Sequence, residues 1–293
     1  MIHIVTCNEN PIPSNLMSFL RTSILMIFLT LSLIIANAQV KDKLSSKIDI
    51  LKSLLSRSDT LYHNEENSET IEDTINKVND QIEKQLTAIL TDEQITKQNL
   101  YDLLEHPALG ILHSVDKKLW IFNWNENTGG TYKSNISILG HKNSLGKFYV
   151  SFDERSNSND FVKNLFPSSG AWFNTIYKLP SKSKNLYLCI GSGIGCTTCI
   201  YNTAVVVELK ENIVNFDYQA FSKNEYDGNG DENLSVFTLS ARLGNIEKFE
   251  FDTKTNILTY AYLTDDNTPV QSEKQKRIVR KLFFNGIKFI PFK

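Results

Sequence analysis

The sequence lacks an excess of charge of either sign. Its 31 Lys and Arg residues nearly balance its 33 Asp and Glu residues, which gives a formal net charge of -2 at pH 7. Proteins that bind nucleic acid usually present a basic face. The one dense basic stretch, residues 274–281, alternates with apolar residues as the solvated side of a strand does. The composition therefore argues against nucleic acid as a partner.

Long apolar runs are also scarce. The run Ile24 to Ile35 has twelve residues and no charge, follows Arg21 and is followed by Ala36-Asn37-Ala38. A membrane-spanning helix needs about 20 apolar residues, whereas a basic residue, a short apolar run and a small-x-small site define a secretory signal peptide. We therefore expect residues 1–38 to be a cleaved signal peptide and the mature chain to begin near Gln39, in the periplasm or outside the cell.

Two details refine the export signal. Residues 1–16 contain no Lys or Arg and resemble no part of a signal peptide, so we expect Met17 to be the true start. The residue directly after the expected cleavage site is Gln39 and not Cys, so we expect no lipid anchor. We expect no other stable membrane anchor either.

The apolar residues of segment 39–108 recur with the period of a helix. One stripe precedes the polar run 63–68 and a second follows it. The first is formed by Leu44, Ile48, Leu51, Leu55 and Tyr62, and the second by Ile71, Ile75, Val78, Ile82, Leu86 and Ile89. Thr91 and Gln94 have the spacing of a capping box, which predicts a third helix that ends at Pro107 and Gly110. Neither stripe lasts as long as a coiled coil requires, so we expect a helical hairpin packed on the rest of the protein.

In segment 109–293 the apolar period changes from three or four residues to two. The pattern predicts strands at 119–124, 131–139, 147–152, 172–179, 186–190, 204–210, 213–218, 234–240, 246–251, 257–264, 277–284 and 287–291. Asn285-Gly286 predicts a type I′ hairpin turn. Because strands do not alternate with helices, we expect an antiparallel β domain, built as a sandwich, an open barrel or a propeller-like array, and an α+β protein overall.

Cysteine is rare, and the expected mature chain has only Cys189, Cys196 and Cys199. The Cys196-x-x-Cys199 motif is not followed by a predicted helix, whose N-terminus would lower the thiol pKa as in thioredoxin-like sites. Three cysteines without a nearby His are too few for structural zinc. We therefore expect a structural disulfide in an oxidising compartment.

Two pairings of these cysteines fit the sequence. A hairpin centred on Ile194 would place Cys189 opposite Cys199, within reach of a disulfide. The other pairing is a tight Cys196–Cys199 bridge inside the connecting loop. The glycines at 191, 193 and 195 are interpreted as part of that loop, because a phosphate-binding loop would need a helix after it.

An acidic loop is the main candidate for metal binding. Asp227, Asn229 and Asp231 place oxygen ligands at alternate positions, as a calcium loop does. Glu232 and Thr238 stand where an EF-hand requires Gly and Glu. A loose calcium site of the extracellular kind and a polar hairpin loop both fit, and we favour the polar loop and expect no other cofactor.

Three alternating aromatic residues are the main candidate for ligand binding. Trp120, Phe122 and Trp124 share one face of a predicted strand, beside Asn125, Glu126 and Asn127. An exposed stripe of this kind would suit a sugar or an apolar ligand. Large aromatics on one strand face more often fill a core, and both interpretations stay open.

The same strand carries a resemblance. The stretch Lys118 to Asn125, followed by Thr128-Gly129-Gly130-Thr131, resembles a hairpin of exported bacterial β-rich proteins of unknown function, and the later segment LYLCIGSG is similar to that family too. The resemblance implies a β-rich exported domain. The family has no activity to carry over.

Local catalytic motifs are absent, because the sequence has neither a G-x-S-x-G elbow nor an H-E-x-x-H zinc motif. We therefore expect an exported, non-catalytic binding or interaction module, whose partner is a small molecule, a glycan or a protein. A hydrolase with acidic residues that converge from separate strands is the alternative, and a thiol–disulfide protein is the second alternative.

Overall fold

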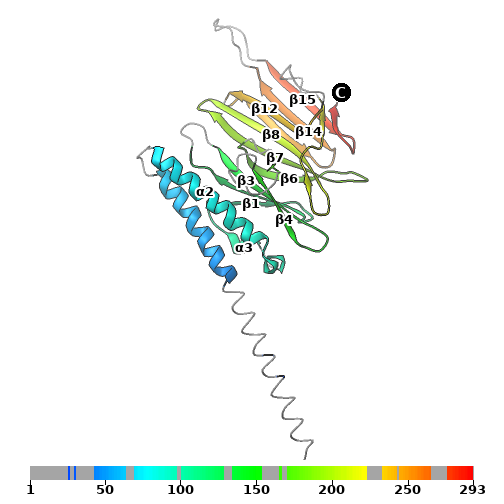
Figure 1. Cartoon of the computed structure of the whole chain (residues 1–293). Coiled ribbons are helices and arrows are strands. Elements are labelled where there is room, and N and C mark those ends of the chain that lie inside the picture. The colour runs from blue at the N-terminus through cyan, green and yellow to red at the C-terminus, as the bar shows by residue number, and fades with distance from the viewer. Residues whose placement is uncertain are drawn as a thin grey trace, which may run out of the picture. The chain divides into compact units, whose positions relative to one another are not determined.

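The computed structural model describes residues 26, 30, 43–63, 69–97, 100–128, 134–153, 165–166, 170–222, 233–242, 244–264 and 276–292. The chain divides into two compact units, Met1–Ser46 and Lys47–Lys293. In the first unit Met26, Thr30 and residues 43–46 are helical, and the rest of the predicted signal peptide lies outside the described residues. No helix among the described residues is long and apolar enough to cross a membrane. The architecture below is that of the second unit (Figure 1).

The second unit begins with helical segments. Residues 47–63 are helical, and they are followed by α2 (Glu69–Leu90), the 3-10 helix η1 (Glu93–Lys97) and α3 (Leu100–Leu104). The predicted stripe of α2 is buried at Ile75, Val78, Ile82, Leu86 and Ile89. The helical hairpin that the apolar spacing predicts is therefore confirmed.

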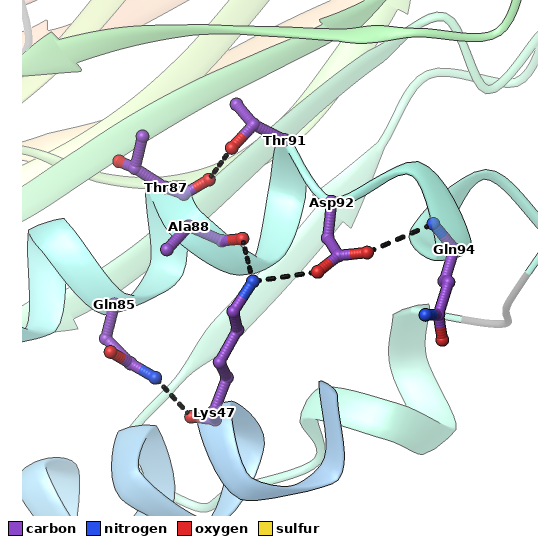
Figure 2. Close-up of polar contacts among 7 residues, drawn as sticks. All are labelled: Lys47, Gln85, Thr87, Ala88, Thr91, Asp92 and Gln94. Atoms are coloured by element: carbon purple, nitrogen blue, oxygen red, sulfur yellow. Dashed lines mark hydrogen bonds and ion pairs between the residues drawn. The ribbon is translucent and has the colours of Figure 1, made fainter. Parts of the chain in front are cut away.

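The predicted third helix is wrong in its start and its length. The Thr91 hydroxyl donates to the Thr87 carbonyl at 2.8 Å, so it closes α2 instead of opening a new helix. Asp92 accepts from the Gln94 main-chain N–H at 3.2 Å and from the Lys47 ammonium at 2.7 Å. Figure 2 shows Lys47 also donating to the carbonyl of Ala88 at the end of α2, at 3.2 Å. These contacts turn the chain after residue 92 and leave two short helices.

The first sheet has five strands in sequence order. They are β1 (Gly110–His113), β2 (Leu119–Asn125), β3 (Asn135–Lys142), β4 (Phe148–Asp153) and β5 (Leu165–Phe166). The pairings are antiparallel except for the short β4–β5 pair.

The second sheet has the order β12–β8–β7–β6, and β9 pairs with the other end of β8. Its strands are β6 (Trp172–Lys178), β7 (Asn185–Cys196), β8 (Cys199–Leu209), β9 (Val214–Asn215) and β12 (Val236–Arg242). The third sheet has the order β11–β10–β16–β15–β14–β13. Its strands are β10 (Phe221–Ser222), β11 (Asn233–Leu234), β13 (Ile246–Asp252), β14 (Ile257–Leu263), β15 (Arg277–Phe284) and β16 (Phe289–Pro291).

Two buried clusters show that the second sheet lies between the other two. One side of β7 and β8 packs on the first sheet, where Leu119 and Ile121 meet Cys189 and Val205. Their other side packs on the third sheet through Leu186, Leu188, Ile190, Ala204 and Val206, which meet Leu258, Tyr260, Phe284 and Phe289. Because side chains alternate between the faces of a strand, one apolar run can supply both cores. The mainly β, α+β architecture is confirmed, and its form is a three-layer sandwich.

The predicted register of the central hairpin is wrong. β7 and β8 turn at Thr197 and Thr198 instead of Ile194, so Cys189 lies opposite Val205. The segment of Gly191, Gly193 and Gly195 is part of strand β7 and not a loop. At Gly191 a side chain would lie 2.9 Å from the carbonyl oxygen of Trp172. The glycines at this point allow close strand packing instead of a turn.

Candidate functional site

One end of the sandwich collects turns from all three sheets. Because neighbouring strands are antiparallel, alternate connections come out at the same end. We call this surface the turn end, and it consists of the turns at residues 114–118, 143–147, 179–184, 210–213, 253–256 and 285–288. Figure 1 shows these turns on the right of the three layers, opposite the tip of the β7–β8 hairpin.

Hydrogen bonds join the turns of the first two sheets. The Lys142 main-chain N–H donates to the Lys118 carbonyl at 2.8 Å. The Asn143 amide donates to the side chain of Asn212 at 3.3 Å, and Glu211 accepts from both the main-chain N–H and the hydroxyl of Ser144. The turn after β3 and the turn after β8 therefore form one continuous surface.

The third sheet joins this surface through Tyr218. Its hydroxyl donates to the Ile287 carbonyl at 2.7 Å, while the Lys184 ammonium lies 4.4 Å from the centre of its ring. The Asn285-Gly286 turn is not the predicted type I′, because Gly286 has a positive φ and Asn285 does not. Instead, the side-chain oxygen Oδ1 of Asn285 accepts from the main-chain N–H groups of Ile287 and Lys288 at 3.0 and 2.9 Å.

Four turns expose an aliphatic side chain at the turn end. Val115 is 89% exposed, Leu145 87%, Ile287 67% and Ile213 59%, and these are the four most exposed large hydrophobic residues among the described part of the second unit. Single exposed apolar residues are normal on protein surfaces. Four of them at one end, on turns that contact one another, form a feature that folding does not explain.

The turn after β3 shows why folding does not require the apolar residue. The Asn143 side chain accepts from the main-chain N–H groups of Leu145 and Lys147, each at 3.0 Å, and Gly146 supplies the positive φ of 78° that this turn uses. Asn and Gly therefore account for the backbone path. Leu145 buries little of its surface, so its presence calls for an explanation outside the fold.

Lysine dominates the charge of the turn end. Within two residues of the six turns the chain has ten lysines and four carboxylates: Lys117, Lys118, Lys142, Lys147, Lys178, Lys182, Lys184, Lys210, Lys254 and Lys288 against Asp116, Glu208, Glu211 and Asp252. The near-neutral net charge of the whole chain hides this local excess. The sequence alone did not predict this surface. A local signal was present, because each exposed aliphatic residue has a Lys within three positions.

The carboxylates of the turn end are already engaged. Glu208 has the ammonium groups of Lys184 and Lys210 at 3.5 and 3.9 Å, and Asp252 accepts from the Thr255 hydroxyl at 2.7 Å. In contrast, Lys117, Lys118 and Lys182 have no carboxylate partner among the residues that the structure describes. The free positive charge therefore points outward from the turns.

Asp116 is the most strongly held of these carboxylates. Burial alone would raise its pKa, but hydrogen bonds from Lys178, Ser114, Tyr187 and the Lys118 main chain outweigh it and lower the pKa from 3.8 to about 2. The Lys178 ammonium and the Tyr187 hydroxyl each lie 2.8 Å from its Oδ2. Asp116 therefore ties the turn before β2 to the second sheet.

This network predicts a specific acid sensitivity. Because the folded-state pKa of Asp116 is depressed, its contribution to the free energy of unfolding is present above pH 4 and is lost as the pH falls toward 2. We expect that contribution to be roughly 1–2 kcal/mol after solvent screening. Urea unfolding of Asp116→Asn should show a smaller loss of stability between pH 4 and 2 than wild type, and the exposed Asp49→Asn should match wild type. Equal acid dependence of Asp116→Asn and wild type would contradict the assignment.

The predicted aromatic face is not a surface. Trp120, Phe122 and Trp124 are all buried, and the Trp124 indole N–H donates to the Asn79 side chain of α2 at 3.1 Å. The interpretation of this stripe as a ligand face is therefore corrected: it packs within the protein, and the core interpretation describes it.

The cysteines adopt one of the two expected pairings. Cys196 and Cys199 form a disulfide, with their sulfur atoms 1.99 Å apart, and Cys189 is buried with a free thiol. Burial raises the pKa of Cys189 far above its usual range, so this thiol is not reactive. The disulfide closes the tip of a β-hairpin, where no helix N-terminus is present to activate a thiol.

The nearest approach to a catalytic pair is Ser56 and His106, whose Oγ and Nε2 atoms lie 3.0 Å apart. However, His106 Nδ1 accepts from the Ala108 main-chain N–H at 3.2 Å. A neutral imidazole that accepts at Nδ1 carries its proton at Nε2, so it donates to Ser56 and does not act as a base toward it.

The remaining candidates for a site are a buried histidine and the acidic loop. His141 is buried and stacks on Tyr149, and burial lowers the pKa of its imidazole. Among the described residues no three His, Cys, Asp or Glu side chains gather as metal ligands. The calcium candidates Asp227, Asn229 and Asp231 lie outside the described residues.

Comparisons with protein-family models, with curated proteins and with solved structures found no match to this chain. The resemblance to exported bacterial β-rich proteins therefore stays a prediction.

Proposed function

We propose that this chain is an exported, non-catalytic binding module, periplasmic or secreted, that attaches through its turn end to a polyanionic surface. The observation that carries the proposal is the excess of lysine at the turn end, ten against four carboxylates. The expected signal peptide supports the exported location. The hydrogen bond from the Ala108 main chain to His106 Nδ1 argues against a hydrolase that would use Ser56 and His106, and the hairpin setting of the disulfide argues against a thiol–disulfide enzyme.

Electrostatics explains why the lysines act together. Charges separated by less than about 8 Å reinforce each other at physiological ionic strength, because the Debye length sets the screening distance. Lys117 and Lys118 are adjacent, and their turn is hydrogen-bonded to the next one through the Lys118 carbonyl. A lysine near an anionic surface contributes on the order of 1 kcal/mol to binding.

Removal of the unpaired charges should weaken this attachment. We expect Lys117→Gln/Lys118→Gln/Lys182→Gln to lower the affinity for heparin, used as a soluble polyanion, by about 30- to 100-fold at low salt, because three charges are lost. The dependence of binding on salt should also become less steep. Isothermal titration at several salt concentrations measures both effects.

A matched variant separates the turn end from the overall charge. Lys77→Gln/Lys84→Gln/Lys276→Gln removes three exposed charges, two from α2 and one from the residue before β15, and it should bind heparin within about twofold of wild type, because distant surface charges are screened. If both triple variants lose the same affinity, or if wild type does not bind heparin at low salt, the proposal is wrong.

A further inference from the structure

We propose that the surface bound by the turn end is an anionic phospholipid bilayer, into which Val115, Leu145, Ile213 and Ile287 insert. This inference rests on the proposed function, because it names the partner of the same surface. The excess of lysine supports the proposed function, whereas the exposed aliphatic residues at the tips of the turns support the bilayer as the partner.

Apolar tips would gain nothing from a polyanion dissolved in water. A polysaccharide chain offers charge and hydroxyl groups but no apolar medium, so an exposed Leu or Ile stays in water when the lysines bind it. The boundary between headgroups and acyl chains of a bilayer offers both phosphate and an apolar phase. Exposed aliphatic tips beside lysines match both parts of that boundary.

The spacing of each tip from its lysine suits insertion. Lys117 follows Val115 by two residues, Lys147 follows Leu145 by two, Lys210 precedes Ile213 by three, and Lys288 follows Ile287 directly. A lysine side chain can direct its ammonium to the phosphates while its methylene groups lie along the apolar boundary. Each tip therefore inserts beside a charge that meets the headgroups.

The arrangement of the tips also suits a flat surface. Val115 and Leu145 belong to the first sheet, Ile213 to the second and Ile287 to the third. Packed sheets lie about 10 Å apart, so the tips are spread over roughly 20 Å. The fold supports this surface rigidly through the bonds of Asp116, Ser144 and Tyr218.

A protein partner fits the same surface less well. The centres of protein–protein interfaces are depleted of lysine, because a buried ammonium loses its hydration. At the turn end each apolar tip has a lysine within three positions of the chain, so an interface that covered the tips would have to cover lysines too. A bilayer leaves such ammonium groups hydrated among phosphates.

The test compares vesicles with a soluble polyanion. We expect Leu145→Ser/Ile213→Ser to weaken binding to vesicles of phosphatidylglycerol and phosphatidylcholine by at least about tenfold, since burial of one aliphatic side chain changes a partition constant by that much. Heparin binding should be unchanged. The matched control is Ile194→Ser/Val279→Ser, which removes exposed apolar residues away from the turn end and should bind both partners as wild type does.

Insertion itself has a direct readout. In Leu145→Trp the new indole should be quenched by lipids that carry bromine on their acyl chains, whereas an indole that stays in water is not. All variants share the same N-terminal segment, so differences in vesicle binding arise from the turns. Both turn residues are exposed, so thermal unfolding should not change.

The outcomes separate the two proposals. Wild-type binding to heparin but not to vesicles would overturn the bilayer and leave the proposed function standing. Binding to vesicles that the double tip variant retains in full would refute insertion. Absence of binding to either partner at low salt would overturn both proposals.

Discussion

Asn123→Leu is expected to lower the free energy of unfolding by about 3–5 kcal/mol, because it removes a buried polar bridge between two sheets. Asn123 lies in β2 with its side chain fully buried. Its amide donates to the Phe173 carbonyl at 3.0 Å and its oxygen accepts from the Phe173 main-chain N–H at 3.2 Å. The same oxygen accepts from the Ser137 hydroxyl at 2.9 Å.

The position of Phe173 explains why the expected effect is so large. β6 is an edge strand of the second sheet, and Asn123 pairs with its main chain as a neighbouring strand would. Leu has a similar size but no hydrogen-bonding group, so the main-chain N–H and carbonyl of Phe173 would each lose the hydrogen bond to Asn123, at about 1–3 kcal/mol each. The same bridge protects the edge strand from pairing with other chains.

Urea unfolding monitored by far-UV circular dichroism measures this loss. Asn174→Leu is the control, because Asn174 lies beside Phe173 in β6 but is exposed. We expect it to change stability by less than about 0.5 kcal/mol. A loss of less than about 1 kcal/mol for Asn123→Leu would contradict the expectation. It would show that packing of the side chain, and not its hydrogen bonds, determines the contribution of residue 123 to stability.

Much of the strand pattern was predictable, because alternation along one strand is a local property. Strand β15 (Arg277–Phe284) has the predicted bounds, and β6, β13 and β14 lie within one residue of them. The order of strands and the stacking of sheets were not predictable. They depend on which apolar faces meet, and every strand offers such a face.

Register was the main local error, and glycine caused it. The run Gly191 to Gly195 has low β propensity and looks like a turn, so the hairpin was centred on Ile194. In the fold a side chain at Gly193 would lie 2.2 Å from the Tyr201 hydroxyl. Position 193 is glycine because the ring of Tyr201 on the opposite strand leaves no room for a side chain. The sequence does not show that Tyr201 is the neighbour until the register is known.

The turn end could not be predicted from the sequence for a different reason. Val115 and Ile287 are 172 positions apart in the numbering, and their turns come to lie at the same end of the molecule only because the three sheets stack. Counted over the whole chain, the local excess of lysine cancels against acids elsewhere. A local signal did exist, since Asn143 and Gly146 are typical turn residues and Leu145 between them is not.

Trp124→Ala is expected to be the other strongly destabilising change, at about 3–5 kcal/mol, because it leaves a cavity between the first sheet and α2. Trp124 is among the largest fully buried side chains. Asn79 of α2 accepts from its indole N–H and donates to the Glu126 carbonyl at 2.7 Å. Asn79 thus holds the helix on β2 at two points, and loss of the indole removes one of them.

Trp124→Phe separates packing from hydrogen bonding. It keeps most of the buried ring and loses the N–H, so we expect about 1–2 kcal/mol, well below the effect of Ala. The same urea titrations measure both variants. If Trp124→Ala costs less than about 1 kcal/mol, the aromatic stripe does not hold the helical hairpin on the sheet. We expect Ala to be well above Phe, because α2 covers Trp124 and Asn79 accepts from its indole N–H.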